Sequence, residues 1–351
     1  MKDFIIIFFF LLLFSCGNKS DDSRKVQLGE FELTIDTMKV DFTSYISPNT
    51  EMSLTHAVKF DEKYYCFFDD EWSNGNRTDI KHFFILTKTG YIQKEIELPS
   101  PIQNCTYFDL FEYKDTIFAK LYMKDNGYYL DTLNEQWVET KKVDDVIYED
   151  DRFCVTYLDY GEWGYATWFI DKETEKEFEL ASSAKIINKI DSSYYLTEGT
   201  WIMKIENPTL LQECKDDYYY EKIEKKDFVE KTFSLIGTEF IYNDTTYSYW
   251  NFEEPKVYIA TSFTYNNNLF HLCIDSAKTF IANVQNNEII PLYTIGRKFS
   301  TFNCFFSYRY RIHENNKQLL KFKTKSTNLY GFIEIEENKI NIRYIKIKKI
   351  Q

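Results

Sequence analysis

Short apolar runs separated by polar turns occupy most of the chain after about residue 30. One cassette recurs, in which a turn rich in Asp, Glu or Asn is followed at once by a short aromatic or aliphatic run. Seven copies begin at Phe60, Tyr113, Glu149, Ile190, Ile236, Tyr265 and Glu314. Alternation of polar and apolar residues, as in residues 91–96 and 339–343, is typical of β-strands. No amphipathic helix of convincing length emerges, so the pattern predicts an all-β fold.

Most cassettes are followed by a second hairpin, in which a polar turn separates two strand-like runs. These second hairpins begin at Phe83, Thr167, Thr200, Thr279 and Tyr330. Two hairpins per repeat make four strands, which is one blade of a propeller. The first apolar residues after successive cassette turns are 53, 36, 41, 46, 29 and 50 residues apart. Apart from the 29, these spacings scatter around the roughly 40 to 50 residues of a four-stranded blade.

The repeats resemble those of β-propeller proteins in general, over residues 30–351. The resemblance implies a closed ring of four-stranded blades, with seven blades favoured. Six blades are an alternative, because a spacing of 29 residues is too short for a complete blade, and a pair of β-sandwiches is another. The alternating segment 31–35 is expected to pair with the final hairpin and close the ring. The basic ending 346–349 fits a strand near an exposed edge, where lysine discourages further pairing.

The amino terminus has the order of a secretion signal. Lys2 precedes eleven apolar residues, 4–14, and small residues follow at 15–17. Spanning a bilayer takes roughly 20 residues, so this run is too short for a membrane helix. Residues 13–17 resemble the lipobox of bacterial lipoproteins, although Phe14 departs from the usual small or aliphatic residue. The resemblance implies cleavage before Cys16 and acylation of Cys16. An ordinary signal peptide with an incidental cysteine is the alternative.

The residues after the cysteine are polar and lack aromatic side chains, which predicts a disordered tether over 16–29. The expected organisation is therefore a signal peptide at 1–15, a lipidated tether at 16–29 and one folded domain at 30–351. Ser20, Asp21 and Asp22 are similar to the acidic surface-export signal of Bacteroidetes lipoproteins. That similarity implies anchoring on the outer face of the outer membrane, with the periplasmic face as the alternative.

Composition and charge indicate which classes of partner to expect. Aromatic residues make up 19% of the chain, with 28 Tyr and 31 Phe, which favours strands. The formal net charge is -13, so the surface repels nucleic acid and anionic lipid at long range. The membrane is therefore expected to be a partner through the lipid anchor, and nucleic acid is not expected to be one.

Six cysteines besides Cys16 are an even number, which permits disulfides in an oxidising compartment. Four of them, Cys66, Cys154, Cys273 and Cys304, lie in apolar runs, where cysteine behaves as a small hydrophobic residue. Cys105 and Cys214 lie nearer polar stretches, and one bridge is possible. His271 is expected to be a core residue. No close Cys or His spacing suggests a metal site, and no cofactor is expected.

The sequence contains no nucleophile elbow, zinc motif, phosphate loop or dinucleotide fingerprint. Acidic and aromatic residues gather instead after three cassettes, at 69–72, 160–165 and 247–250, and in a propeller these segments could share one face. Carboxylates beside flat rings suit sugars, because C–H faces stack on rings while hydroxyls donate to carboxylates. The candidate binding residues are Trp72, Trp163, Tyr165, Tyr249 and Trp250. The alternative is that these rings pack against one another at the blade tips.

Two functions fit these observations. The first is a membrane-anchored, surface-exposed module that binds a glycan or a protein without catalysis. The second is an extracellular carbohydrate-active propeller enzyme, which needs two carboxylates roughly 5 to 9.5 Å apart. No catalytic residue is assigned, and Asp70 and Glu162 are the candidates that such an enzyme would use.

Overall fold

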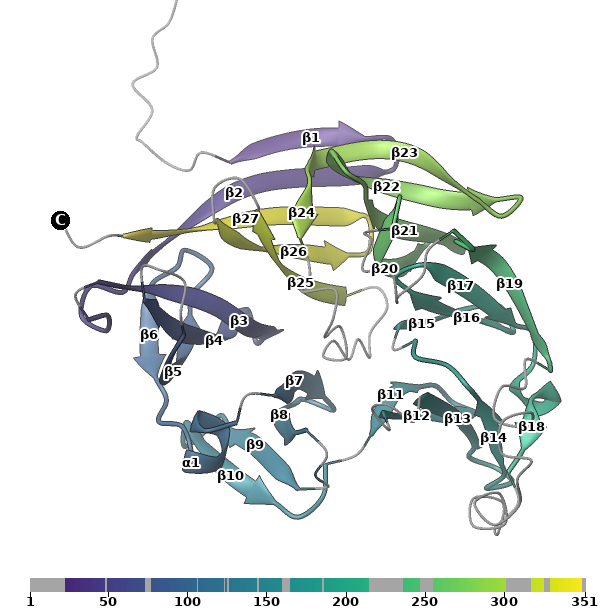
Figure 1. Ribbon diagram of the computed structural model, residues 1–351, viewed down its shortest axis with the longest axis horizontal. Coiled ribbons are helices and arrows are strands. Elements are labelled where there is room, and N and C mark those ends of the chain that lie inside the picture. Colours follow the sequence, from purple (N-terminus) through teal and green to yellow (C-terminus); the bar gives the residue numbers. More distant parts are fainter. Residues whose placement is uncertain are drawn as a thin grey trace, which may run out of the picture.

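The computed structural model is a β-propeller in which six sheets surround a central axis (Figure 1). The structure describes residues 23–47, 49–72, 77–105, 107–122, 124, 126–143, 145–159, 165–184, 186–214, 236–246, 255–300, 317–324 and 329–348. The predicted all-β fold of four-stranded blades is confirmed. The favoured number of seven blades is wrong, because there are six, which was the alternative.

The first three blades follow the chain in order. Blade 1 contains Thr50–Phe60 (β3), Lys63–Trp72 (β4), Arg77–Leu86 (β5) and Ile92–Glu95 (β6). Blade 2 contains Phe108–Tyr113 (β7), Thr116–Leu121 (β8), Gly127–Asp131 (β9) and Gln136–Thr140 (β10). Blade 3 contains Val146–Glu149 (β11), Phe153–Asp159 (β12), Tyr165–Asp171 (β13), Glu177–Leu180 (β14) and Gln212–Glu213 (β18). The short helix Ser100–Gln103 (α1) lies between blades 1 and 2 in the chain.

The remaining blades complete the ring. Blade 4 contains Ile186–Ile190 (β15), Ser193–Glu198 (β16), Trp201–Ile205 (β17) and Thr238–Asn243 (β19), with the 3-10 turn Pro208–Leu210 (η2) after β17. Blade 5 contains Tyr258–Tyr265 (β20), Asn268–Ile274 (β21), Lys278–Gln285 (β22) and Glu288–Arg297 (β23). Blade 6 contains Phe299–Ser300 (β24), Lys317–Thr324 (β25), Tyr330–Glu336 (β26), Lys339–Lys348 (β27), Phe31–Asp41 (β2) and Arg24–Leu28 (β1).

One cassette accounts for the error in blade number. The cassette that begins at Ile236 does not open a blade, because its apolar run is β19, which pairs with β17 as the last strand of blade 4. The turn before it contains Gly237 at a φ of 78°, a conformation that favours glycine. A turn followed by an apolar run therefore marks either the first hairpin of a blade or its outer strand, and this ambiguity created a seventh blade in the prediction.

The two ends of the chain close the ring in blade 6. Strand β2 pairs in parallel with β27 from Glu32 opposite Lys339 to Asp41 opposite Lys348, and β1 then pairs with β2. The predicted pairing of segment 31–35 with the final hairpin is confirmed. The basic end of β27 does not form the outer edge of the sheet, however, because β2 and β1 lie outside it.

The two faces of the ring differ in their connections. On the hairpin face, tight turns join first to second strands and third to fourth strands of several blades. Four of these turns place two consecutive residues at positive φ: Asp61 and Glu62, Lys114 and Asp115, Asn266 and Asn267, and Asn286 and Asn287. Such pairs are typical of two-residue hairpin turns, which match the twist of the strands. We call the opposite face, where second strands end and third strands begin, the loop face.

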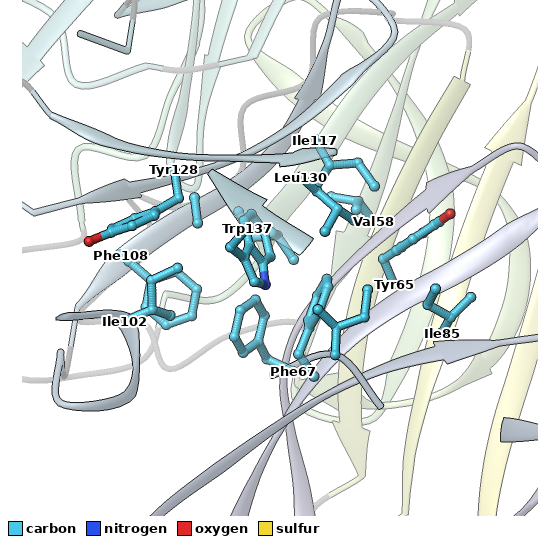
Figure 2. Close-up of a cluster of buried hydrophobic side chains, with 14 of the residues drawn as sticks. Val58, Tyr65, Phe67, Ile85, Ile102, Phe108, Ile117, Tyr128, Leu130 and Trp137 are labelled. Atoms are coloured by element: carbon cyan, nitrogen blue, oxygen red, sulfur yellow. The ribbon is translucent and has the colours of Figure 1, made fainter. Parts of the chain in front are cut away.

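The core consists of side chains that pack between neighbouring blades. Along β4, Tyr64, Cys66 and Phe68 pack toward blade 6, whereas Tyr65 and Phe67 pack toward blade 2. Figure 2 shows the second of these clusters, in which Phe67 approaches Phe108 and Trp137 of blade 2. Because successive side chains of a strand point to opposite sides, a blade buried on both sides reads as a continuous aromatic run.

Carboxylates on the hairpin face also join blades. Asp150 of blade 3 accepts hydrogen bonds of 2.7 Å from both Lys189 Nζ and Tyr194 Oη of blade 4. Burial raises the pKa of Asp150, but hydrogen bonds from Lys189 and the Phe153 amide outweigh burial and lower that pKa to about 2. The ionised carboxylate is therefore favoured in the folded state.

Asp150 should make stability depend on acid. Its pKa in the folded protein is below the ordinary value of 3.8, so its contribution to stability is present above about pH 4 and is lost as the pH falls toward 2. Asp150→Asn should remove about 2 kcal/mol of this acid dependence, measured as urea midpoints from pH 6 to pH 2. Asp151→Asn, in the exposed neighbour, is the control. An unchanged pH dependence in Asp150→Asn would contradict the assignment.

Candidate functional site

Large apolar side chains are exposed along the loop face of blades 1 to 3. Strand ends in three successive blades contribute Trp72, Ile80, Tyr107, Tyr122, Leu158 and Tyr165, which we call the aromatic arc. Trp72 is 48% exposed and Tyr165 is 37% exposed. Single exposed apolar residues are ordinary, but several large ones at one face of a fold are candidates for interaction. The arc is therefore the candidate binding site among the described residues.

Blade 2 holds the centre of the arc. Tyr107 lies directly before β7, and Tyr122 lies directly after β8. The two ring centroids are 6.3 Å apart at an interplanar angle of 70°, and the Tyr122 amide donates a 3.1 Å hydrogen bond to the Tyr107 carbonyl oxygen. This backbone bond holds the two residues side by side, and their exposed rings lie edge to face.

In blade 3, a second aromatic ring backs the exposed ring of the arc. Tyr165, the first residue of β13, stacks on Tyr157 of β12 with centroids 6.2 Å apart and an interplanar angle of 21°. Tyr157 is buried, so it backs Tyr165 from the protein side. The neighbouring Leu158 is 39% exposed and points to the other side of β12.

Carboxylates lie under the blade 1 end of the arc. Asp69 and Asp70 are the last buried residues of β4, with exposures of 5% and 2%, and Trp72 follows them. Their side chains point to opposite sides of the strand, so they do not form a facing pair. Asp70 Oδ1 has no hydrogen-bond partner in the described part of the chain. The Thr78 hydroxyl donates a 2.7 Å hydrogen bond to the Asp70 carbonyl oxygen, which ties the start of β5 to the end of β4.

Two polar contacts link the segments that carry the arc. Lys120 of β8 pairs with Asp145, which lies before β11, so blades 2 and 3 are joined on the loop face. Lys81 Nζ of β5 donates a 2.8 Å hydrogen bond to the Gln103 carbonyl oxygen at the end of α1. This second contact joins blade 1 to the connection that leads to Tyr107.

The structure places part of the predicted site. Trp72 and Tyr165 both lie exposed on the loop face, in blades 1 and 3, with blade 2 between them. Asp70 lies on the same face but is buried. The other candidates, Glu162, Trp163, Tyr249 and Trp250, lie outside the described residues. The binding and catalytic roles assigned to all of these residues stay predictions.

Sequence reasoning missed Tyr107 and Tyr122. Neither belongs to an acidic and aromatic cluster, so neither attracted notice. The available signal was position, because Tyr122 follows the second strand of its blade as Trp72 follows the second strand of blade 1.

The structure also locates His271 and five of the cysteines. His271 is 1% exposed, its Nδ1 lies 2.6 Å from Ser262 Oγ, and burial lowers its pKa to about 3, so its prediction as a core residue is confirmed. Cys66 and Cys273 are buried as expected, whereas Cys154 is only half-buried. None of the five described cysteines, which include Cys105 and Cys214, forms a disulfide, and Cys304 lies outside the described residues.

The described residues contain no group of three or more His, Cys, Asp or Glu side chains placed to hold a metal ion. Within the described ranges, no helix is long and apolar enough to cross a membrane.

No protein-family model matches this chain, and no curated protein sequence matches it. Among solved structures, a luciferin-regenerating enzyme is similar at 8% identity and a TM-score of 0.35, covering 82% of this chain and 88% of its own. An exported protein of Bacteroides fragilis is similar at 11% identity and a TM-score of 0.31, with the same coverage of 82% and 88%. The dihydro-heme d1 dehydrogenase NirN is similar at 8% identity and a TM-score of 0.35, covering 80% of this chain and 64% of its own. These values are too low to carry a functional argument.

Proposed function

We propose that this protein is a membrane-anchored binding module that holds a glycan or a protein ligand on the aromatic arc of its propeller. The observation that carries the proposal is the exposure of aromatic and aliphatic side chains from three successive blades on the loop face. Exposed rings are costly to leave in water, and their flat faces suit the C–H faces of sugars or the apolar core of a protein interface.

The arrangement supports binding more than catalysis. A carboxylate that transfers a proton must come within hydrogen-bond reach of the reacting atom. Asp70 is only 2% exposed, so neighbouring groups would have to move before a glycosidic oxygen reached it. The rings of Trp72 and Tyr122, in contrast, are already accessible.

The anchor is the second part of the proposal. It rests on the lipobox-like residues 13–17, with Cys16 as the acylated residue, and on the polar tether that follows. Ser20, Asp21 and Asp22 support export to the outer face of the outer membrane. The anchor would hold the propeller at the cell exterior, where soluble or surface-bound ligands can reach the arc.

Glycan-array binding tests the arc. The wild-type protein should bind at least one glycan class, and Trp72→Ala/Tyr122→Ala should lose most of that signal, because each ring contributes about 1 kcal/mol or more to ligand stacking. Tyr91→Ala is the matched control, since Tyr91 is 70% exposed in a turn on the hairpin face. Equal binding by the double variant would remove the arc from the proposal, and release of sugar products from a polysaccharide panel would favour the enzyme alternative.

A further inference from the structure

The charge of this protein is unevenly distributed. The whole chain carries a formal net charge of -13, yet residues 23–47, 317–324 and 329–348 contain ten Lys or Arg and seven Asp or Glu. These residues form the amino-terminal strands and most of blade 6. Blade 6 is therefore locally basic on an acidic molecule.

Three exposed basic residues lie on one side of this blade, and we call them the basic strip: Arg24, Lys39 and Lys346. Lys39 and Lys346 are register partners in the parallel pair of β2 and β27, so their side chains point to the same side. That side faces blade 5, because Phe31 and Leu33, which share the parity of Lys39, pack with Phe263. Met38 and Val40 pack toward blade 1 instead.

Arg24 extends the strip onto β1. It pairs with Ile35, which lies on the same side of β2 as Lys39 and four residues before it.

Carboxylates within the described residues do not neutralise the strip. Asp41 is the acidic residue at this end of β2, and it pairs with Lys348 at 2.8 Å. None of the three strip residues makes an ion pair with a carboxylate in the described part of the chain.

One end of the basic strip lies close in the chain to the proposed anchor. Arg24 is eight residues after Cys16, and a fully extended chain spans at most about 3.3 to 3.6 Å per residue, so the two lie within about 28 Å of each other. Strand β1 is the outermost strand of blade 6, whereas blades 2 and 3 lie across the ring (Figure 1). An acyl anchor on Cys16 would thus bring blade 6 to the membrane before blades 2 and 3.

We propose that the basic strip rests on the anionic headgroups of the membrane and holds the propeller on its blade 6 edge, with the arc of blades 2 and 3 directed outward. The inference rests on the proposed anchor. Attraction of Lys and Arg to an anionic surface is short-ranged in physiological salt, so only residues kept close by the tether take part.

Lysine acylation read by mass spectrometry tests this orientation. The full-length lipidated protein is reconstituted in phosphatidylglycerol–phosphatidylcholine vesicles, in phosphatidylcholine vesicles and in detergent. Labelling of Lys39 and Lys346 should fall at least about threefold in the anionic vesicles relative to detergent and should change little in the neutral vesicles. Lys124 and Lys141, which are exposed on blade 2, are internal controls and should label equally in all three samples.

The possible outcomes separate the two proposals. A protein that does not float with vesicles contradicts the anchor, and this inference fails with it. A floating protein whose Lys39 and Lys346 label equally in all samples contradicts the strip alone. Equal protection in neutral and anionic vesicles overturns the role of charge, and protection of Lys124 or Lys141 instead overturns the orientation.

Discussion

Arg343→Ala is expected to lower the free energy of unfolding by roughly 3 kcal/mol, because it removes a largely buried cation that holds the ring closed. Arg343 Nε and Nη2 each donate a 2.9 Å hydrogen bond to the Asp36 carboxylate, and Nη1 donates one of 2.8 Å to Tyr64 Oη. The Arg343 side chain is 13% exposed. Its removal would leave the Asp36 carboxylate half-buried without its partner.

The contacts of Arg343 join three parts of the chain that are far apart in sequence. Asp36 lies on β2, Arg343 on β27 and Tyr64 on β4 of blade 1. Burial raises the pKa of Tyr64, so its hydroxyl stays protonated and donates to Glu334, which also pairs with Lys59 at 2.9 Å. The cluster thus connects the first strand pair, the last strand and the first blade, where the propeller closes.

Urea unfolding checks this prediction. The matched control is Lys176→Ala, which breaks a 3.0 Å pair with Glu213 in which the side chains are 53% and 47% exposed. Exposed ion pairs contribute about 0 to 1 kcal/mol, so the control should change stability little. A similar loss in both variants would mean that Arg343 has no special part in closure.

Cys16→Ala is expected to move the protein from the membrane fraction to the soluble fraction. Acyl chains contribute about 0.8 kcal/mol per buried CH2, and two or more chains give stable attachment. Removal of the cysteine removes every chain at once, so the effect should be nearly complete. Cell fractionation measures it, and protease added to intact cells shows whether the anchored wild-type protein lies on the outer face.

Cys154→Ala is the control for this variant, because Cys154 is a half-buried cysteine of β12 in the folded domain. It should remain in the membrane fraction. If Cys16→Ala also remained there, residues 1–15 would have to be an uncleaved signal or another anchor would have to exist, and the lipoprotein proposal would be wrong.

The sequence predicted the local elements of the fold better than their assembly. The turn at Asp61 and Glu62 and the apolar run after it are visible without a structure, because turn residues and strand formers have strong local preferences. The place of Thr238–Asn243 in blade 4 depends on its pairing with Trp201–Ile205, across the segment between η2 and Gly237. Such pairing is a long-range property that a local pattern does not contain.

The sequence predicted those residues of the candidate site that lie in a cluster of acidic and aromatic residues. Trp72 follows three acidic residues and was found, whereas Tyr107 and Tyr122 stand alone in sequence and meet only through the pairing of β7 with β8. The basic strip was not predicted from the sequence for the same reason. Lys39 and Lys346 are far apart in the chain, and the net charge of -13 sums over both sides of the molecule.

The most direct measurement of the central claim is the dissociation constant of the tightest array ligand, determined by titration calorimetry. Wild type, Tyr107→Ala and Tyr91→Ala should be compared under one salt condition. Binding through the arc predicts that Tyr107→Ala weakens affinity about tenfold, equivalent to about 1.4 kcal/mol, while Tyr91→Ala matches wild type. An unchanged dissociation constant in Tyr107→Ala, or an equal loss in Tyr91→Ala, would contradict the claim that this protein binds its ligand on the aromatic arc.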